Sequence, residues 1–249
     1  MVNYEKLYSM NSNGDNQIEV LFEDNHLLVV NKPALLPTMG VKAGDDSLYR
    51  RAAEYLKTKY NKPGNVYVGI VSRLDAHTTG AIVLARTSKA ASRLSDQIRR
   101  GTIEKRYLAL IPAGLLPANA TLSDRLVKNE SLHRMQVIPE NAAAVPNEKN
   151  ALLSYQTIAE NNQLQALDID LQTGRKHQIR VQLENTGFPI LGDRKYGSQR
   201  RFPAGIALHC RSLSFLHPTK KVVQSIKIHP PDYWPTANLE KIDSFLRNN

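Results

Sequence analysis

An arginine and a carboxylate lie two residues apart in a short polar loop between two apolar segments. Arg73 and Asp75 are preceded by the apolar run 66–71 and followed by the run 81–85, and Gly80 provides a turn into the second run. Loops held by strands on both sides often carry functional residues. An ionised carboxylate beside a cation can act as a nucleophile, whereas an isolated turn Asp more often bonds its own backbone.

A second polar cluster is the stretch 174–180, which reads Gly-Arg-Lys-His-Gln-Ile-Arg. It follows a predicted strand over 164–171, and we expect a helix over 176–185. Positions i, i+4 and i+7 of that helix share one side, which would be formed by Lys176, Arg180 and Leu183. A basic helix face of this kind is more often simply exposed to solvent. The cluster therefore indicates a functional site only in combination with the carboxylate of Asp75.

Tyr107 is a third candidate, at the beginning of a predicted strand over 105–111. A tyrosine here can stack its ring on a base and present its hydroxyl to a reacting proton. Tyrosines in strands are more often core residues with one end in water, so Tyr107 alone indicates little.

These segments resemble the motifs of one enzyme family, the pseudouridine synthases of the RluA type. Residues 69–80 are similar to its H-R-L-D-x-x-T-S-G motif, with Ser72 in place of the usual His and Thr79 in place of Ser. The stretch 174–180 resembles G-R-x-H-Q-I-R. Two further segments match the family. Lys105-Arg106-Tyr107 resembles its K-x-Y strand, and Val29-Val30-Asn31-Lys32-Pro33 resembles its opening strand and turn.

The resemblance covers roughly residues 19–228 and implies an RNA pseudouridine synthase, which detaches a uracil from its ribose, rotates it and rejoins it through carbon. No cofactor or metal is expected. Asp75 would attack the nucleotide, at the ribose or at the base, while Arg180 pairs with its carboxylate. Tyr107 would stack on the uracil and assist proton transfer, and Arg73 would fill the space of the extruded base. Further RNA contacts are expected from Thr78, Arg93, Arg100, Arg175, Lys176 and Leu183.

The charge balance agrees with a nucleic-acid partner. The 249 residues carry a formal net charge of +10, which favours binding to a polyanion. We expect structured RNA, either rRNA or tRNA, bound by a monomer. The single cysteine, Cys210, fits a reducing cytoplasm. No apolar run approaches the roughly 20 residues needed to cross a bilayer, and no secretion signal is found, so we expect a cytoplasmic protein without membrane contact.

Strands and helices are interspersed irregularly, which favours an α+β fold. The resemblance implies a pseudouridine synthase fold with a mainly antiparallel central sheet, flanking helices and a central active-site cleft. We expect a polar tail over 1–17, no S4-type RNA-binding domain, and a catalytic domain over 18–249. That domain would have two subdomains and an irregular, proline-containing excursion at about 112–150. Helices are predicted over 47–59, 88–100 and 238–246.

Other functions fit the residues less well. The main alternative is a catalytically silent RNA-binding protein on the same fold, but phosphate binding needs no carboxylate in a basic cleft. A hydrolase with Asp75 as nucleophile would need a second carboxylate as general acid. A triad of Ser72, Asp75 and His77 lacks the second glycine of a nucleophile elbow. His209 and Cys210 are strand neighbours that point to opposite faces, which disfavours a metal site.

Overall fold

The computed structural model describes residues 17–42, 44–235 and 242–248. The strands are β1 (Glu19–Glu23), β2 (Leu27–Lys32), β3 (Gly69–Ile70), β4 (Thr79–Ala85), β5 (Glu104–Pro112), β6 (Asn119–Asn129), β7 (Arg134–Ile138), β8 (Lys149–Glu160), β9 (Leu164–Leu171), β10 (Leu208–Leu216) and β11 (Val223–Lys227). The helices are α2 (Leu48–Lys59), α3 (Ser88–Arg100), α4 (Gln178–Asn185), α5 (Ile242–Asn248) and a short 3-10 turn, η1 (Arg194–Tyr196).

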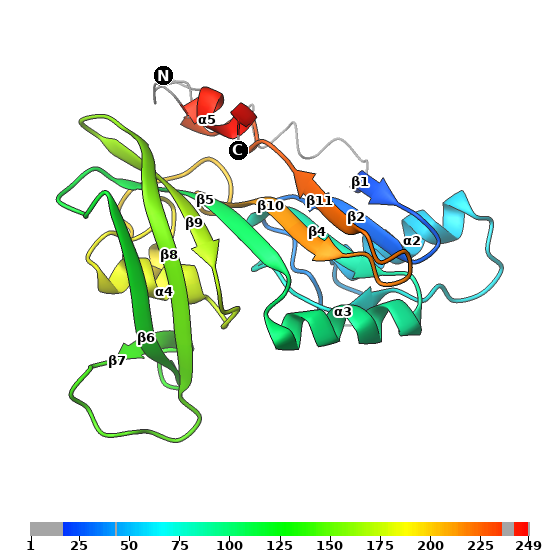
Figure 1. Cartoon of the computed structure of the whole chain (residues 1–249), viewed down its shortest axis with the longest axis horizontal. Coiled ribbons are helices and arrows are strands. Elements are labelled where there is room, and N and C mark those ends of the chain that lie inside the picture. Colours follow the sequence, from blue (N-terminus) through cyan, green and yellow to red (C-terminus); the bar gives the residue numbers. More distant parts are fainter. Residues whose placement is uncertain (1–16, 43, 236–241, 249) are drawn as a thin grey trace.

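An eleven-stranded sheet runs through the whole molecule (Figure 1). Its main path is β1-β2-β4-β10-β5-β9-β8-β6-β7, with β11 paired to β10 and β3 paired to β4. β4 and β10 run parallel, whereas the other pairs described are antiparallel. This mainly antiparallel α+β architecture confirms the predicted fold class.

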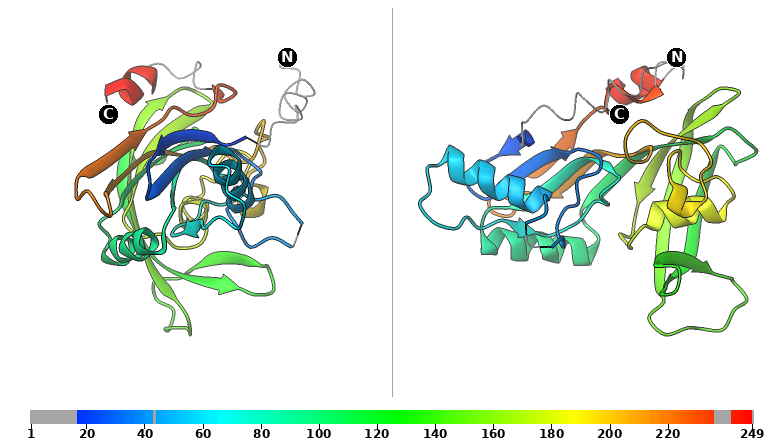
Figure 2. Two further views of the ribbon diagram at one scale, coloured as in Figure 1. Left: turned by 90° about the vertical axis from the view of Figure 1, so that its right-hand side faces the viewer. Right: turned by 180° about the vertical axis from the view of Figure 1, so that it is seen from behind.

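The helices α2, α3 and α4 lie at two different ends of the sheet (Figure 2). α2 and α3 lie at the end built on β1, β2 and β4, while α4 lies against the long strands at the other end. The central strands β5 and β10 join the two ends. The sheet therefore places the Asp75 loop, which precedes β4, opposite the beginning of α4.

Local capping explains why α2 and α3 begin and end close to the predicted residues. The side chain of Ser47 accepts a hydrogen bond from the N–H of Arg50, and that of Thr87 accepts one from Ala90. Gly101 ends α3 in the left-handed conformation, with φ of 69°. These signals lie within one turn of the helix ends, so the sequence alone could place the boundaries.

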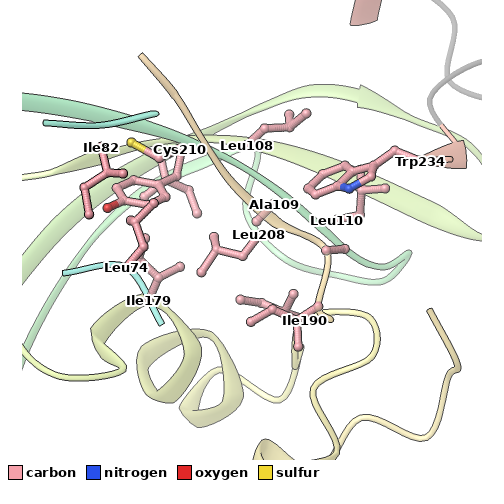
Figure 3. Close-up of a cluster of buried hydrophobic side chains, with 14 of the residues drawn as sticks. Leu74, Ile82, Leu108, Ala109, Leu110, Ile179, Ile190, Leu208, Cys210 and Trp234 are labelled. Carbon is pink, nitrogen blue, oxygen red and sulfur yellow. The ribbon is translucent and has the colours of Figure 1, made fainter. Parts of the chain in front are cut away.

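A shared hydrophobic core connects the two site segments. Leu74 of the loop and Ile179 of α4 belong to the same cluster of buried side chains, which also contains Leu108 and Leu208 (Figure 3). Burial of an aliphatic side chain of this size contributes about 2 kcal/mol. The Asp75 loop and α4 thus rest on one packed core.

The expectation of an irregular excursion over 112–150 is wrong. This stretch contains β6 and β7, and β6 pairs with β8 from Asn119 opposite Gln156 to Leu126 opposite Lys149. Most β6 residues remain exposed or half-buried because the strand extends beyond the main core (Figure 1). Ala120, Leu122 and Leu126 alternate along its inner face, but the polar Asp124 interrupts them, so the apolar pattern is too short to identify a strand.

Three smaller predictions concern the ends and one strand. All but Gln17 of the expected polar tail lies outside the described residues. The predicted helix over 238–246 corresponds to α5, and 238–241 likewise lie outside the part that is described. The strand expected over 66–71 is reduced to β3. Among the described residues, none of the helices has both the length and the apolar character required to cross a membrane.

Candidate active site

A cavity of about 580 Å³ opens between the Asp75 loop and the beginning of α4. Residues 70–76 and 174–180 form opposite walls, and Tyr107 of β5 also lines it. Asp75 is the one carboxylate among the described residues that line this cavity. The same lining contains five cationic side chains, those of Arg73, Lys105, Arg175, Lys176 and Arg180. The cavity therefore suits an anionic ligand that meets a single negatively charged group.

The loop that carries Asp75 is held through its main chain. The hydroxyl of Thr38 donates to the carbonyl of Leu74 at 2.8 Å and accepts from the N–H of Leu74 at 3.2 Å. The ammonium of Lys32 donates to the carbonyl of Ala76 at 3.1 Å. Both residues adjoining Asp75 are thereby fixed.

The C-terminal part of the chain closes the loop from its other side. The N–H of Ile206 donates to the carbonyl of His77 at 3.1 Å. Gly80 has φ of +121°, and a Cβ at this position would lie 2.5 Å from the main-chain N and O of Cys210. The close approach of β4 to β10 therefore requires the glycine of the motif.

Lys32 is a fully buried ammonium beneath the loop. Besides Ala76, it donates to the carbonyls of Pro33 and Leu36, at 2.7 and 2.9 Å. Burial lowers the pKa of Lys32 to about 7, and the nearby Asp75 carboxylate opposes that shift. Lys32 lies within the motif Val29-Val30-Asn31-Lys32-Pro33, but nothing in that motif indicates its role beneath the loop.

Arg180 connects Asp75 to a second carboxylate that sequence reasoning missed. Its Nη1 lies 3.2 Å from Oδ2 of Asp75. Its Nε and Nη2 form a fork with the two oxygens of the buried Asp193, at 2.7 and 2.8 Å. Burial acts to lower the pKa of Arg180, but Asp193 and Asp75 outweigh it and the pKa is raised. The two-bond clamp is therefore directed at Asp193, and Asp75 receives a single bond.

His177 and Tyr196 form a second link to Asp75. Nε2 of His177 lies 3.6 Å from Oδ1 of Asp75, and its Nδ1 lies 2.9 Å from the hydroxyl of Tyr196. Burial lowers the pKa of His177 to about 4 despite the opposing effect of Asp75. Tyr196 is fully buried and also faces Arg180, whose guanidinium lies 5.0 Å from the ring centroid.

Two neutral hydroxyl groups complete the cavity. Tyr107 is almost completely buried, and burial together with the neighbouring Cys210 raises the pKa of its phenol well above the ordinary value. It therefore stays protonated. Thr78 also lines the cavity, and its buried hydroxyl lacks a hydrogen-bond partner among the described residues. Such a group is available to a polar ligand atom.

A side-chain network holds the turn before α4. Oε1 of Gln178 accepts from the hydroxyl of Thr173 at 2.8 Å and from the N–H of Arg175 at 3.0 Å. One helical turn later, Nε2 of Gln182 donates to Oδ2 of Asp124 on β6 at 2.7 Å. The glutamine of the motif therefore shapes the turn.

The expected RNA contact at Leu183 is wrong, because this side chain is fully buried in the core. The helix begins at Gln178, so Lys176 lies in the preceding turn and does not share a helix face with Arg180. Arg180 itself lines the cavity but is almost completely buried. Lys176 is exposed at the rim.

The remaining predicted RNA contacts lie in two places. Arg73 and Arg175 are exposed at the cavity. Arg93 and Arg100 lie on α3, outside the cavity lining. Arg93 is half-buried and donates to the carbonyl of Pro218 at 2.7 Å, and Arg100 pairs with Asp96 at 2.8 Å.

Comparisons with known proteins identify the family of this chain. The uncharacterized RNA pseudouridine synthase YhcT of Bacillus subtilis is 31% identical over 81% of this chain and 65% of its own length. The ribosomal large subunit pseudouridine synthase D of Nitrosomonas europaea is 33% identical over 81% of this chain and 58% of its own. The chain thus spans less than two thirds of the length of these two relatives.

A solved structure shares the fold. Human RNA pseudouridylate synthase domain containing 1 superposes with a TM-score of 0.72, over 94% of this chain and 96% of that one, at 23% identity. The family model described as RNA pseudouridylate synthase matches residues 26–185, which include the Asp75 loop, Tyr107 and Arg180. The chain therefore belongs to the RNA pseudouridylate synthase family.

Proposed function

We propose that this protein converts uridine in RNA to pseudouridine. The observation that carries the proposal is that Asp75 is the lone carboxylate, beside five cations, among the described residues that line the cavity, and that it lies 3.2 Å from the buried Arg180. Binding of phosphate alone would be weakened by a carboxylate at this place. A nucleophile held beside a fixed cation explains it.

The reaction is an isomerisation in which atoms and electrons balance. The bond between N1 of uracil and C1′ of ribose breaks, and a bond between C5 and C1′ forms. The proton on C5 is lost and N1 gains one, so no oxidant or reductant is consumed. In this proposal Asp75 attacks the nucleotide, Arg180 pairs with its carboxylate, and the neutral Tyr107 stacks on the uracil and assists proton transfer.

Access to the uracil requires that the base leave its stack, at a cost of a few kcal/mol. We assign Arg73, at the exposed rim, to the space that the base vacates. Thr78 offers its unpaired hydroxyl to a polar atom of the nucleotide. The cations that remain for the RNA backbone are Arg93, Arg100, Arg175 and Lys176.

The substrate in this proposal is a structured rRNA or tRNA. The name of the Nitrosomonas relative, a ribosomal large subunit enzyme, supports rRNA. We further propose that residues 18–249 form one catalytic domain of two subdomains, which acts as a monomer in the cytoplasm.

The test maps pseudouridine in total RNA from cells with and without this gene, and then treats the unmodified RNA with purified protein. We expect at least one position to lose its modification and to regain it with the wild type. Asp75→Asn should turn over at least about 10³-fold more slowly, because an amide cannot replace the nucleophile. The matched control is Asp45→Asn, which changes an exposed carboxylate in the same way.

Three outcomes would contradict the proposal. Unchanged maps and no product with purified protein would exclude the activity. RNA binding without product would instead identify a silent binding protein. Wild-type turnover by Asp75→Asn would show that Asp75 is not the nucleophile.

A further inference from the structure

The hydroxyl of Tyr196 forms hydrogen bonds with two neighbouring residues, Met135 and His177. It accepts the N–H of Met135 on β7 at 3.1 Å, and it lies 2.9 Å from Nδ1 of His177. Because burial raises the pKa of Tyr196, the phenol keeps its proton. Among the described residues, Nδ1 of His177 is the acceptor within hydrogen-bond distance of this proton, so the hydroxyl donates it to Nδ1.

This bond determines where His177 carries its own proton. A neutral imidazole has one donor and one acceptor nitrogen. Since Nδ1 accepts from Tyr196, the proton lies on Nε2, the nitrogen that faces Oδ1 of Asp75 at 3.6 Å. The opposite tautomer would place the Nε2 lone pair against the carboxylate.

The charges around the ring keep it neutral. Burial lowers the pKa of His177, Arg180, Lys176 and Lys195 act in the same direction, and Asp75 opposes them. The side chain is 11% exposed, so little water competes for its nitrogens. The ring is thereby held neutral at neutral pH.

The two oxygens of Asp75 consequently face two different donors. Oδ2 lies 3.2 Å from Nη1 of Arg180, and Oδ1 lies 3.6 Å from Nε2 of His177. The second distance is longer than a hydrogen bond, as is common for catalytic groups before the ligand binds. A movement of less than 1 Å would close it.

We propose, on the basis of the function proposed above, that His177 is a positioning residue for Asp75, and that Tyr196 fixes its neutral Nε2–H tautomer. Met135 extends this connection to the β6–β7 hairpin, so the hairpin and the carboxylate are joined through Tyr196 and His177. His177 is not a base in this arrangement, because neither nitrogen presents a free lone pair to the nucleotide.

The first test observes the tautomer directly in the full-length protein. ¹⁵N chemical shifts of the His177 ring distinguish the two neutral forms, and we expect the Nε2–H form at pH 7. Tyr196→Phe keeps the ring but removes the hydroxyl, and should shift the ring toward the Nδ1–H form and raise its pKa. Tyr49→Phe, an exposed tyrosine on α2, is the control. An Nδ1–H tautomer in the wild type would overturn the inference, whether or not the protein is active.

The second test uses turnover of single and double variants. The amide nitrogen of glutamine can occupy the place of Nε2, whereas that of asparagine replaces only Nδ1. We expect His177→Gln to stay within about threefold of the wild type, and His177→Asn to be about 10- to 100-fold slower with an unchanged Kd for RNA.

Tyr196→Phe should slow the wild type about tenfold, but should add less than about twofold to His177→Gln, which has no tautomer to fix. Thermal melts check that each variant folds. An equal effect of Tyr196→Phe in both backgrounds would assign Tyr196 a purely structural role. Absence of turnover in the wild type would contradict the proposed function and leave the NMR result to decide the tautomer.

Discussion

The Asp75 loop and the turn before α4 face each other across one cavity, but they are held by different kinds of bonds. The loop is fixed at its peptide groups, through Leu74, Ala76 and His77. The turn is fixed by side chains that bond to other side chains or to remote carbonyls, above all Gln178 and Arg180.

The difference has consequences for how each segment tolerates change. Peptide groups are present whatever the side chain, so a loop held through them depends on few residue identities. A network of side chains loses a bond with each substitution and leaves a buried partner unsatisfied. We therefore expect the α4 side of the cavity to be the more sensitive one.

Arg180→Lys tests this expectation with the largest effect. Lysine keeps the charge but cannot maintain the fork to Asp193 together with the bond to Asp75. We expect turnover to fall more than about 100-fold and the free energy of unfolding to fall by about 2 kcal/mol. Kinetics with RNA and chemical denaturation measure the two effects.

Arg125→Lys is the matched control for that experiment. Arg125 also pairs with a carboxylate, that of Glu148 at 3.2 Å, but it does not line the cavity. Its replacement should leave turnover within about twofold of the wild type. Full activity of Arg180→Lys would contradict the greater sensitivity expected of the α4 side, because the side-chain network would then be dispensable.

Lys32→Met tests one of the two side chains, those of Lys32 and Thr38, that bond the peptide groups of the Asp75 loop. The pKa of Lys32 is lowered from 10.5 to about 7 in the folded protein, so between these pH values the unfolded chain holds more protons. The free energy of unfolding of the wild type should then rise with pH across this range, by up to about 1.4 kcal/mol per pH unit. The variant lacks this contribution to the slope.

Denaturation of the two proteins between pH 6.5 and about 9 measures the difference in slope. The absolute stability of Lys32→Met also falls, because three carbonyls lose their donor, so the slope is the quantity to compare. Lys57→Met, an exposed residue of α2, should retain the wild-type slope. Parallel curves for Lys32→Met and the wild type would show that Lys32 does not titrate in this range.

Salt titrations of RNA binding give the smallest expected effect. Each neutralised phosphate contributes about 0.7 to 0.9 to the slope of log affinity against log salt. Replacing both Arg175 and Lys176 by Ala should remove up to two such contributions, since both line the cavity. Replacing Arg93 and Arg100 should remove about one, because Arg93 is already bonded to Pro218. Equal losses for the two pairs would place α3 as close to the RNA as the α4 turn.

The sequence predicted what is encoded locally. Ser47, Thr87 and Gly101 cap helices within one turn of themselves, and α2 and α3 were accordingly placed well. β6 was missed because Asp124 interrupts its short apolar alternation, and its position is determined by pairing with β8. Local patterns carry no information about such a partner.

The site was predicted only in part for a related reason. Asp75, Arg180 and Tyr107 lie in recognisable motifs, and all three line the cavity. The motif does not reveal that Arg180 pairs with Asp193. Asp193 lies in an irregular segment after α4, where no periodic pattern indicates which residue it contacts. Its one local signal is the pair Gly192 and Gly197, whose positive φ angles enclose a tight turn.

The parallel pairing of β4 with β10 has a consequence for the order of folding. The hydroxyl of Thr79 lies 2.8 Å from Nδ1 of His209, 130 residues further along the chain. Contacts at such separation require closure of a long loop before they contribute any stability. During synthesis, Asp75 leaves the ribosome long before the strand that closes its loop. The newly made chain therefore contains the carboxylate of Asp75 before the strand that holds its loop has been synthesised.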